Sequence, residues 1–238
     1  MIQNQLTSLF THAAKIYDLP VNPCKKVKRM GNSDSRSLNF WTLDEYKQFI
    51  QTMEPGTRYY LIFEMLFWTG CRIGELLAIT KADINFEKNQ LSINKTYYRT
   101  GMQDIITEPK TKQSFRTIEI PEFLKEEIKE FVDGHYGMPD TERLFPVVQE
   151  AVQHKMKRQI ELAGVKKIRV HDLRHSHVAY LIEKGVEPLL IRDRLGHKDI
   201  RITLNTYGHL YPNQQRKIAN LLDNENAVTG LGEERDEC

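Results

Sequence analysis

The sequence is poor in the features that are typical of secreted proteins, of membrane-spanning proteins and of proteins stabilised by a structural metal ion. Its 238 residues include three cysteines, far apart and in no Cys-x-x-Cys pair, which argues against a disulfide framework or a structural zinc site. The longest apolar stretch, residues 59–68, is interrupted by Glu64 and is too short for a bilayer core of about 30 Å. No basic and apolar leader typical of a signal peptide opens the chain. We therefore expect a globular protein in the reducing cytoplasm.

The net charge of +2 hides an uneven distribution along the chain. Residues 151–220 carry a balance of +8 and residues 1–36 a balance of +4. Residues 37–150 and 221–238 are each at −5. A basic C-terminal half with a basic entry segment suits a ligand with a phosphate backbone. A solvated, lysine-rich surface explains the charge equally well, so the motifs must decide.

Hydrophobic periodicity predicts a mainly α fold with one small, three-stranded antiparallel β-sheet, which is an α+β class. The strands are expected at 90–98, 104–108 and 115–120, where Arg116, Ile118 and Ile120 alternate with more polar positions. Helices are expected at 3–17, 42–53, 57–69, 72–79, 122–133, 147–163, 171–184, 187–195, 199–209 and 213–223.

Composition predicts three parts of the chain. Residues 1–37 read as one amphipathic helix followed by a basic linker rich in Gly, Ser and Asn. Residues 38–222 are expected to form the main domain. Residues 223–238 are acidic and are expected to be a flexible tail.

Four short segments carry the residues suited to chemistry: Thr69–Leu76 (TGCRIGEL), His171–His175 (HDLRH), Leu195–His197 (LGH) and Thr206–His209 (TYGH). They offer guanidiniums that can hold the nonbridging oxygens of a phosphodiester, and imidazoles that can relay protons. A phenol can attack phosphorus to form a covalent intermediate. No carboxylate cluster suited to Mg²⁺ accompanies them, so the arginines would supply the electrostatic stabilisation.

A leaving alkoxide also needs a proton donor. Lys110 lies at the tip of a turn between two predicted strands, where it could reach the phosphate. Lys112 is the alternative donor in the same turn.

The succession of TGxRxxE, HxLR, LGH and a tyrosine ten residues after the last histidine resembles the tyrosine recombinase (phage-type integrase) family. The resemblance covers roughly residues 38–222 and implies the fold of that family's catalytic domain. It also identifies residues 1–37 as the last helix and linker of a core-binding domain, most of which we expect to be missing. The implied function is a site-specific DNA recombinase of a phage or integrative mobile element.

By this resemblance, Tyr207 is the nucleophile that forms a 3′-phosphotyrosine and releases a 5′-hydroxyl. Arg72 and Arg174 clamp the phosphate, His171 accepts or relays a proton, and His197 bonds a nonbridging oxygen. The remaining implied roles are protonation of the leaving oxygen by Lys110 and support of the site by Glu75. His175, one turn after His171, is also expected to support the site.

The resemblance also implies the partners. Neither a metal ion nor ATP is required, because the phosphotyrosine retains the energy of the broken bond. Double-stranded DNA is the expected substrate, with self-association into a tetramer on it and a helix at 213–223 that packs on a neighbouring protomer. Residues expected to contact the DNA backbone are Lys112, Lys155, Lys157, Arg158, Lys166, Lys167 and Arg169.

Several alternatives stay open. Tyr211 is a second candidate nucleophile, and each basic residue could simply face solvent. His171 and His175 have the i, i+4 spacing of zinc ligands, although no glutamate follows the first histidine as in HExxH. A DNA-binding regulator without catalysis, or a strand transferase like the type IB topoisomerases, would carry part of the same pattern.

Overall fold

The computed structural model describes residues 2–27, 39–109, 114–135, 137, 139–210, 219–220 and 222–225. Residue contacts divide the chain into two compact units, 1–37 and 38–238. No helix among the described residues is long and apolar enough to cross a membrane.

The first unit is one helix, α1 (Ile2–Ile16), followed by a short 3₁₀ turn, η1 (Pro23–Lys25). Asn22 holds the two together, because its side-chain amide donates to the Thr7 carbonyl at 3.1 Å and to Thr11 Oγ1 at 2.9 Å. A lone helix of this length is marginal in water, so these bonds help to stabilise its middle turns.

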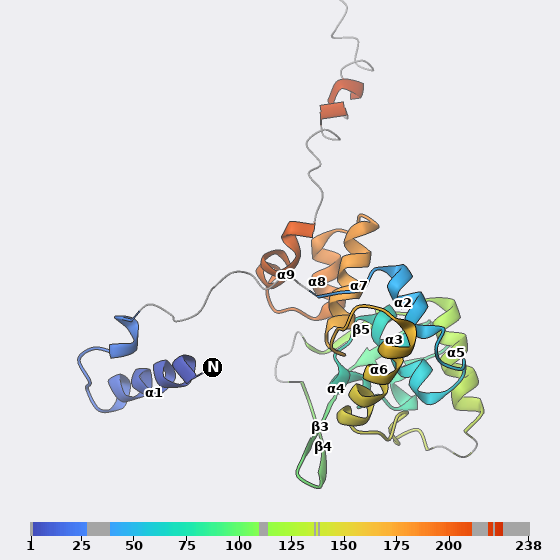
Figure 1. Ribbon diagram of the computed structural model, residues 1–238, viewed down its shortest axis with the longest axis horizontal. Coiled ribbons are helices and arrows are strands. Elements are labelled where there is room, and N and C mark those ends of the chain that lie inside the picture. The colour runs from blue at the N-terminus through green and yellow to red at the C-terminus, as the bar shows by residue number, and fades with distance from the viewer. Residues whose placement is uncertain are drawn as a thin grey trace, which may run out of the picture. The chain divides into compact units, whose positions relative to one another are not determined.

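The second unit is mainly helical, as the periodicity predicts (Figure 1). Its helices are α2 (Leu43–Ile50), α3 (Arg58–Thr69), α4 (Ile73–Leu76), α5 (Glu122–Asp133), α6 (Gln149–Ala163), α7 (Asp172–Glu183), α8 (Pro188–Leu195) and α9 (Ile200–Tyr207), with 3₁₀ turns η2 (Lys81–Asp83) and η4 (Gly208–Leu210). Its strands are β1 (Ile84–Asn85), β2 (Gln90–Ile93), β3 (Thr96–Thr100), β4 (Gln103–Thr107) and β5 (Arg116–Glu119). The predicted helices are confirmed to within about three residues at each end. The helix expected at 213–223 lies largely outside the described residues.

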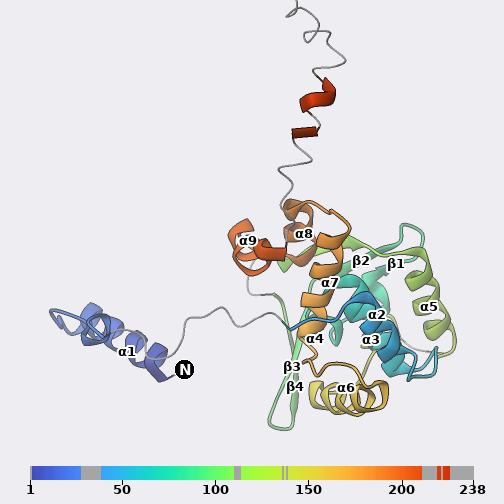
Figure 2. The same cartoon turned by 45° about the horizontal axis from the view of Figure 1, so that its top comes forward.

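The predicted α+β class is confirmed, but the prediction of a single sheet is wrong. The strands form an antiparallel sheet in the order β1-β2-β5 and a separate hairpin, β3-β4, which projects from the unit (Figures 1 and 2). The chain leaves the first sheet at Asn94 and Lys95, because both side chains turn to Asp83. Asn94 Nδ2 donates to Asp83 Oδ1 at 2.8 Å, and Lys95 Nζ lies 2.6 Å from Oδ2. The predicted strand 90–98 is therefore two strands in different ladders.

Helix α3 is the centre of the larger hydrophobic core. It is buried on nearly all faces, and its Phe67 ring stacks on Tyr46 with ring centroids 3.7 Å apart. The carboxylate of Glu64 is buried here and accepts hydrogen bonds from Tyr46 Oη and Trp68 Nε1, both at 2.8 Å. Burial raises the pKa of Glu64 to about 7. The aromatic residues of this helix thus serve the core, as the sequence indicates.

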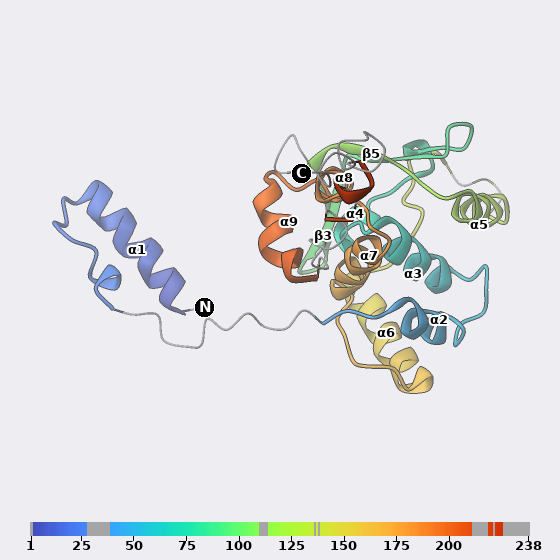
Figure 3. The same cartoon turned by 90° about the horizontal axis from the view of Figure 1, so that it is seen from above.

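A second, smaller apolar cluster joins the last three helices. Its buried members are Val178 and Ile182 of α7, Ile191 and Leu195 of α8, and Tyr207 of α9. Helices α9 and α5 lie on opposite sides of the unit, with α7 and α3 between them (Figures 1, 2 and 3). Helix α7 therefore connects the main core with the cluster that holds Tyr207.

Candidate active site

Arg174 is held by the C-terminal ends of two helices. Its Nη1 donates to the Gly70 carbonyl at 2.7 Å, just after α3, and its Nη2 donates to the Leu195 carbonyl at 2.8 Å, at the end of α8. Both helices end in a left-handed glycine, Gly70 at φ 66° and Gly196 at φ 67°. Glycine adopts this conformation without strain, and the carbonyls at a helix C-terminus carry partial negative charge. The two glycines, Gly70 and Gly196, thus let two helix ends present their carbonyls to the guanidinium of Arg174.

The binding position of Arg174 also depends on a close approach between Gly70 and His177. A Cβ atom on Gly70 would lie 2.5 Å from His177 Cδ2, so a side chain cannot fit there. His177 Nε2 accepts from Arg194 Nε at 3.1 Å, and Arg194 also donates to the Trp68 and Glu119 carbonyls at 3.0 Å. Burial lowers the pKa of His177 to about 3, so the ring is neutral. His177 and Arg194 therefore hold α3, α7, α8 and β5 in place.

Arg72 and Glu75 form a pair across the short helix α4. Glu75 accepts from the Arg72 backbone N–H at 2.8 Å and from Arg72 Nη1 at 2.7 Å. On its other side, Glu75 Oε2 accepts from Arg116 Nη2 at 2.9 Å. Burial acts to raise the pKa of Glu75, but the hydrogen bonds and charge of Arg116, with the charge of Arg72, lower it to about 2. Glu75 is therefore ionised and holds both the backbone N–H and the guanidinium of Arg72.

The positive charge at this place exceeds the negative charge that faces it. Arg174 is 3% exposed, and within the described part of the chain no carboxylate lies within 4.0 Å of its guanidinium. Burial, followed by the charge of Arg72, lowers the pKa of Arg174 to about 9. Glu75 offsets only one of the charges of Arg72, Arg116 and Arg174. A buried cation without a counter-ion is costly, so the site favours an anionic ligand.

Two imidazoles lie in the field of the same arginines. Burial and the charges of Arg174 and Arg72 lower the pKa of His197 to about 4, and its Nδ1 lies 2.9 Å from Thr203 Oγ1. His171 is at the N-terminal end of α7, where partial burial and then the charge of Arg174 lower its pKa below the ordinary 6.5. Both rings are neutral near pH 7 and can donate one hydrogen bond each.

Tyr207 ends α9, and its phenol is buried in the same place. Its side chain is 2% exposed, and burial raises its pKa to about 12, while the charges of Arg174 and Arg72 act in the opposite direction. Its Oη lies 2.6 Å from Nδ1 of His175. The structure thus brings a phenol, two guanidiniums and three imidazoles within electrostatic reach of one another. Lys110, Lys112 and Tyr211 lie outside the described residues.

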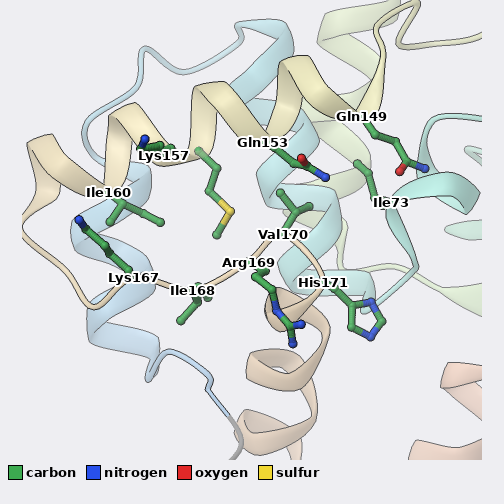
Figure 4. Close-up of a pocket in the computed structure, with 11 residues that line it drawn as sticks. Ile73, Gln149, Gln153, Lys157, Ile160, Lys167, Ile168, Arg169, Val170 and His171 are labelled. Atoms are coloured by element: carbon green, nitrogen blue, oxygen red, sulfur yellow. The ribbon is translucent and has the colours of Figure 1, made fainter. Parts of the chain in front are cut away.

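A groove beside His171 is lined by several of the basic residues. The space, of about 650 Å³, lies between α6 and the segment that leads into α7 (Figure 4). Lys157 comes from α6, while Lys167 and Arg169 come from the opposite segment. Arg169 turns towards the first turn of α7 and is paired with Asp172 there at 2.8 Å. Three of the predicted backbone-contact residues therefore surround one groove that ends at the candidate site.

The other described basic candidates lie elsewhere. Lys155 Nζ is 5.9 Å from the ring centroid of Tyr59, and Lys166 Nζ is 5.6 Å from that of Phe40. Arg158 is exposed on α6 and does not line the groove. These three do not line the groove, and their contact with a DNA backbone stays a prediction.

Among the described residues, no group of three or more His, Cys, Asp and Glu side chains lies close enough together to hold a metal ion. The rings of His171 and His175 meet edge to face with centroids 5.2 Å apart. Nδ1 of His175 is already in contact with Tyr207. The i, i+4 pair is therefore part of the cluster around the phenol.

Comparison with known proteins identifies the family. The model of the phage integrase family matches residues 39–214.

The chain belongs to this family.

Among related proteins of this family, the ICEBs1 integrase of Bacillus subtilis (strain 168) is 31% identical over 239 residues, which cover 92% of this chain and 65% of that protein. A tyrosine recombinase XerC-like protein of Caldanaerobacter subterraneus is 28% identical and covers 93% of this chain and 64% of its own. The chain thus spans slightly less than two-thirds of the length of these relatives.

Solved structures of tyrosine recombinases share the fold. The Tn1549 transposon integrase in complex with a circular intermediate DNA superposes with a TM-score of 0.76 at 19% identity, covering 94% of this chain and 77% of that one. A lambda integrase dimer bound to a core site gives a TM-score of 0.58 at 19% identity, covering 84% and 72%. The predicted membership in the phage-type integrase family and its catalytic-domain fold are therefore confirmed.

Two arginines of this phage integrase family member, Arg116 and Arg194, hold the site together although they lie outside the four motifs. Arg116 binds Glu75 and donates to the Arg194 carbonyl at 2.8 Å. A signal for Arg116 was present, because it shares the strand face of the buried residues Ile118 and Ile120, where a charge needs a partner. Arg194 gave no such signal, since its position on α8 resembles that of any exposed basic residue.

Proposed function

We propose that the protein is a site-specific DNA recombinase, an integrase of a phage or integrative mobile element, that cuts and rejoins DNA through a 3′-phosphotyrosine. The main support is the buried phenol of Tyr207 in the field of Arg72 and Arg174. A binding module has no use for a buried phenol beside an excess of guanidinium charge. The names of relatives such as the ICEBs1 integrase, and the circular intermediate DNA bound by the Tn1549 integrase, agree with this proposal.

In the proposed reaction, Arg174 and Arg72 bind the nonbridging oxygens of the scissile phosphate. Tyr207 attacks phosphorus, and the bond from phosphorus to the 5′-oxygen breaks. His197 donates a hydrogen bond to the phosphate, where its neutral ring needs no charge compensation. Because negative charge grows on these oxygens in the transition state, fixed cations there lower the barrier.

Three further residues complete the proposed site. His171 lies at its exposed edge and can bond the phosphate or relay a proton. Glu75 keeps Arg72 in place through its two hydrogen bonds. Lys110 is proposed to protonate the leaving 5′-oxygen. The chemistry requires neither a metal ion nor ATP, because the new phosphotyrosine retains the energy of the broken bond.

A covalent trap tests the proposal. The protein is incubated in EDTA with a pool of nicked duplexes whose sequence around the nick is randomised, so that a cleaved strand loses its short 5′-hydroxyl fragment and cannot be resealed. We expect protein–DNA adducts that survive denaturation, with the nucleotide on the peptide that contains Tyr207 when mapped by mass spectrometry. Sequencing of the recovered DNA should reveal a preferred site, and complexes on that DNA should have the mass of a tetramer.

Other results of the trap would contradict the proposal. An adduct on Tyr211 would reassign the nucleophile. Adducts without sequence preference, together with relaxation of supercoiled plasmid by a monomer, would indicate a topoisomerase. DNA binding with no adduct at all would indicate a regulator on the same fold.

We also propose that the groove beside His171 carries the DNA backbone. Replacing Lys157 and Lys167 together by glutamine should weaken binding of duplex DNA about tenfold at moderate salt. The salt slope of the affinity should fall by about 2, because two phosphate contacts are lost. Fluorescence anisotropy titrations at several salt concentrations measure both quantities.

The matched control for the groove is the pair Lys155→Gln and Lys166→Gln. It removes the same charge from the same region of the unit, but from side chains that lie over Tyr59 and Phe40. We expect this double variant to change the salt slope by less than half as much. Equal losses in the two variants would mean that only the total charge matters and that the groove has no special role.

A further inference from the structure

The hydroxyl of Tyr207 has a partner that the family motifs do not assign to it. Nδ1 of His175 lies 2.6 Å from Tyr207 Oη, a distance typical of a strong O–H···N hydrogen bond. His175 lies one turn after His171 on α7, and its side chain is 15% exposed. The contact joins α7 to α9 inside the site, so the phenol is held directly by an imidazole.

The opposite nitrogen of the same ring faces a buried carboxylate. Nε2 of His175 lies 4.0 Å from Oδ1 of Asp172, which is 2% exposed. Asp172 is fixed by Arg169, whose backbone N–H donates to Oδ2 at 2.8 Å and whose Nη2 donates to Oδ1 at 2.8 Å. A carboxylate beside Nε2 favours the tautomer that carries its hydrogen there. Nδ1 is then left with a lone pair directed at the phenol.

We propose that His175 is the catalytic residue that accepts the proton of Tyr207 and that Asp172 is the positioning residue for its ring. The inference rests on the proposed recombinase function and assigns one step of it. As Tyr207 Oη bonds to phosphorus, its O–H bond breaks and the proton moves to Nδ1 of His175. The bond from phosphorus to the 5′-oxygen breaks in the same displacement, and the 5′-oxygen takes its proton from the leaving-group acid proposed above, Lys110.

The charges around the pair agree with this assignment. Burial, and then the neighbouring His171, lower the pKa of His175 below the ordinary 6.5, while Asp172 acts to raise it and Arg169 and Arg174 act to lower it. The ring is therefore neutral at pH 7 and can accept a proton. Burial raises the pKa of Tyr207 to about 12, against the opposing charges of Arg174 and Arg72, so the phenol does not ionise without an acceptor.

His171 is the competing acceptor, and its position is less suitable. Its ring meets that of His175 edge to face with centroids 5.2 Å apart, but the imidazole nitrogen at hydrogen-bond distance from the phenol is Nδ1 of His175. His171 is exposed at the edge of the site, while the ring of His175 also contacts that of Tyr207, with centroids 5.5 Å apart. His175 is thus the imidazole in direct contact with the phenol.

The first test needs neither DNA nor activity. The nitrogens of ¹⁵N-labelled histidines are observed by NMR in the free protein between pH 5 and pH 8, a window set by the ordinary histidine pKa of about 6.5. We expect Nδ1 of His175 to be unprotonated and Nε2 to carry the hydrogen at pH 7, with a shift of Nδ1 in the Tyr207→Phe variant. A hydrogen on Nδ1 in the wild-type protein would overturn the proposal, because that ring would donate to the phenol.

The second test separates the proton acceptor from the leaving-group acid. A substrate whose scissile 5′-oxygen is replaced by sulfur needs no leaving-group acid, because a thiolate departs without a proton. His175→Gln, which can still hydrogen-bond to Tyr207, should reduce single-turnover cleavage about 10²-fold on both the oxygen and the sulfur substrate. His154→Gln on α6, an exposed histidine outside the site, should leave both rates unchanged.

The pH dependence completes the test. The cleavage rate of the wild-type protein should fall at low pH as His175 becomes protonated. This acid limb of the pH–rate profile should be missing in His175→Gln. Asp172→Asn should move it to lower pH, because the charge of Asp172 raises the pKa of His175. If Asp172→Asn fails to fold, His175→Gln decides alone.

Two outcomes would overturn the inference. A limb that disappears in His171→Gln and persists in His175→Gln would make His171 the acceptor. Full recovery of His175→Gln on the sulfur substrate would make His175 the leaving-group acid. If the wild-type protein forms no adduct, the recombinase function itself fails, whatever the NMR result.

Discussion

Replacing Arg174 by lysine should slow single-turnover DNA cleavage about 10³-fold while the protein stays folded. The guanidinium donates to the Gly70 and Leu195 carbonyls with two different nitrogens, and a guanidinium has five N–H groups, so further donors can bind a phosphate. A lysine ammonium is a point charge on a flexible stem and cannot hold both carbonyls and a phosphate fork at once. Comparable arginines that stabilise phosphoryl transition states are worth about 10³–10⁵-fold.

The measurement separates catalysis from binding and from folding. Cleavage of the trapped substrate is followed at saturating protein, DNA affinity is followed by anisotropy, and stability by urea unfolding. We expect the affinity to change less than tenfold, and the free energy of unfolding to fall by about 1–2 kcal/mol, because one buried carbonyl loses its donor. Arg158→Lys, an exposed arginine on α6, is the control and should match the wild-type protein. A loss of cleavage below tenfold would mean that Arg174 is only a structural cation.

The contacts of Arg174 also explain why two of the motifs, TG and LG, contain a glycine. A glycine is needed after α3 and after α8 to turn each helix end so that its last carbonyls face one guanidinium. The close packing of Gly70 on His177 adds a second reason at the first of these positions. Arg174 and Gly70, about 100 positions apart in the sequence, are thus joined through a backbone carbonyl, a group that any residue provides. The requirement on the sequence is the glycine at the end of each helix.

Much of the architecture followed from local rules. The helices could be predicted because their apolar spacing, the Thr42–Glu45 capping box and the helix-ending glycines act within a few residues. The sheet could not be predicted correctly, because the break at Asn94 and Lys95 depends on the carboxylate of Asp83. That carboxylate lies on another element, and its contacts exist only after folding.

The candidate site divides in the same way. Arg72, Arg174 and Tyr207 could be selected from the sequence, because their residue types suit one reaction and their motifs resemble those of the tyrosine recombinase family. The contact between His175 and Tyr207, and the pairing of Glu75 with Arg116, could not be read from the sequence because they join separate elements. The burial of Tyr207 has the same origin, since its pocket is made by α7 and α8. The reactive residue types could thus be identified from the sequence, whereas their protonation states depend on contacts and burial that only the folded structure shows.

Replacing Glu75 by glutamine should lower the free energy of unfolding by about 3–5 kcal/mol at pH 7. Arg116 has a side chain that is 6% exposed, and its partner carboxylate is 5% exposed. Glutamine keeps the shape and one acceptor oxygen, but it leaves the charge of Arg116 buried without a counter-ion. Arg72 would also lose its anchor, although its 41% exposure makes that part small.

The pH dependence gives this prediction its sign. The pKa of Glu75 is about 2 in the folded protein, below the ordinary 4.5, so its contribution is fully present above about pH 4.5. It is lost as the pH falls towards 2, and the difference corresponds to about 3 kcal/mol. Urea unfolding between pH 2 and pH 7 should therefore show a stability loss that is about 3 kcal/mol larger in the wild-type protein than in Glu75→Gln, while the loss from carboxylates such as Asp83 and Asp172, whose pKa values are also lowered, is common to both. Glu161→Gln, an exposed glutamate on α6, is the matched control, with an expected change within about 0.5 kcal/mol. Parallel curves for the wild-type protein and Glu75→Gln would show that the carboxylate does not hold the two arginines together.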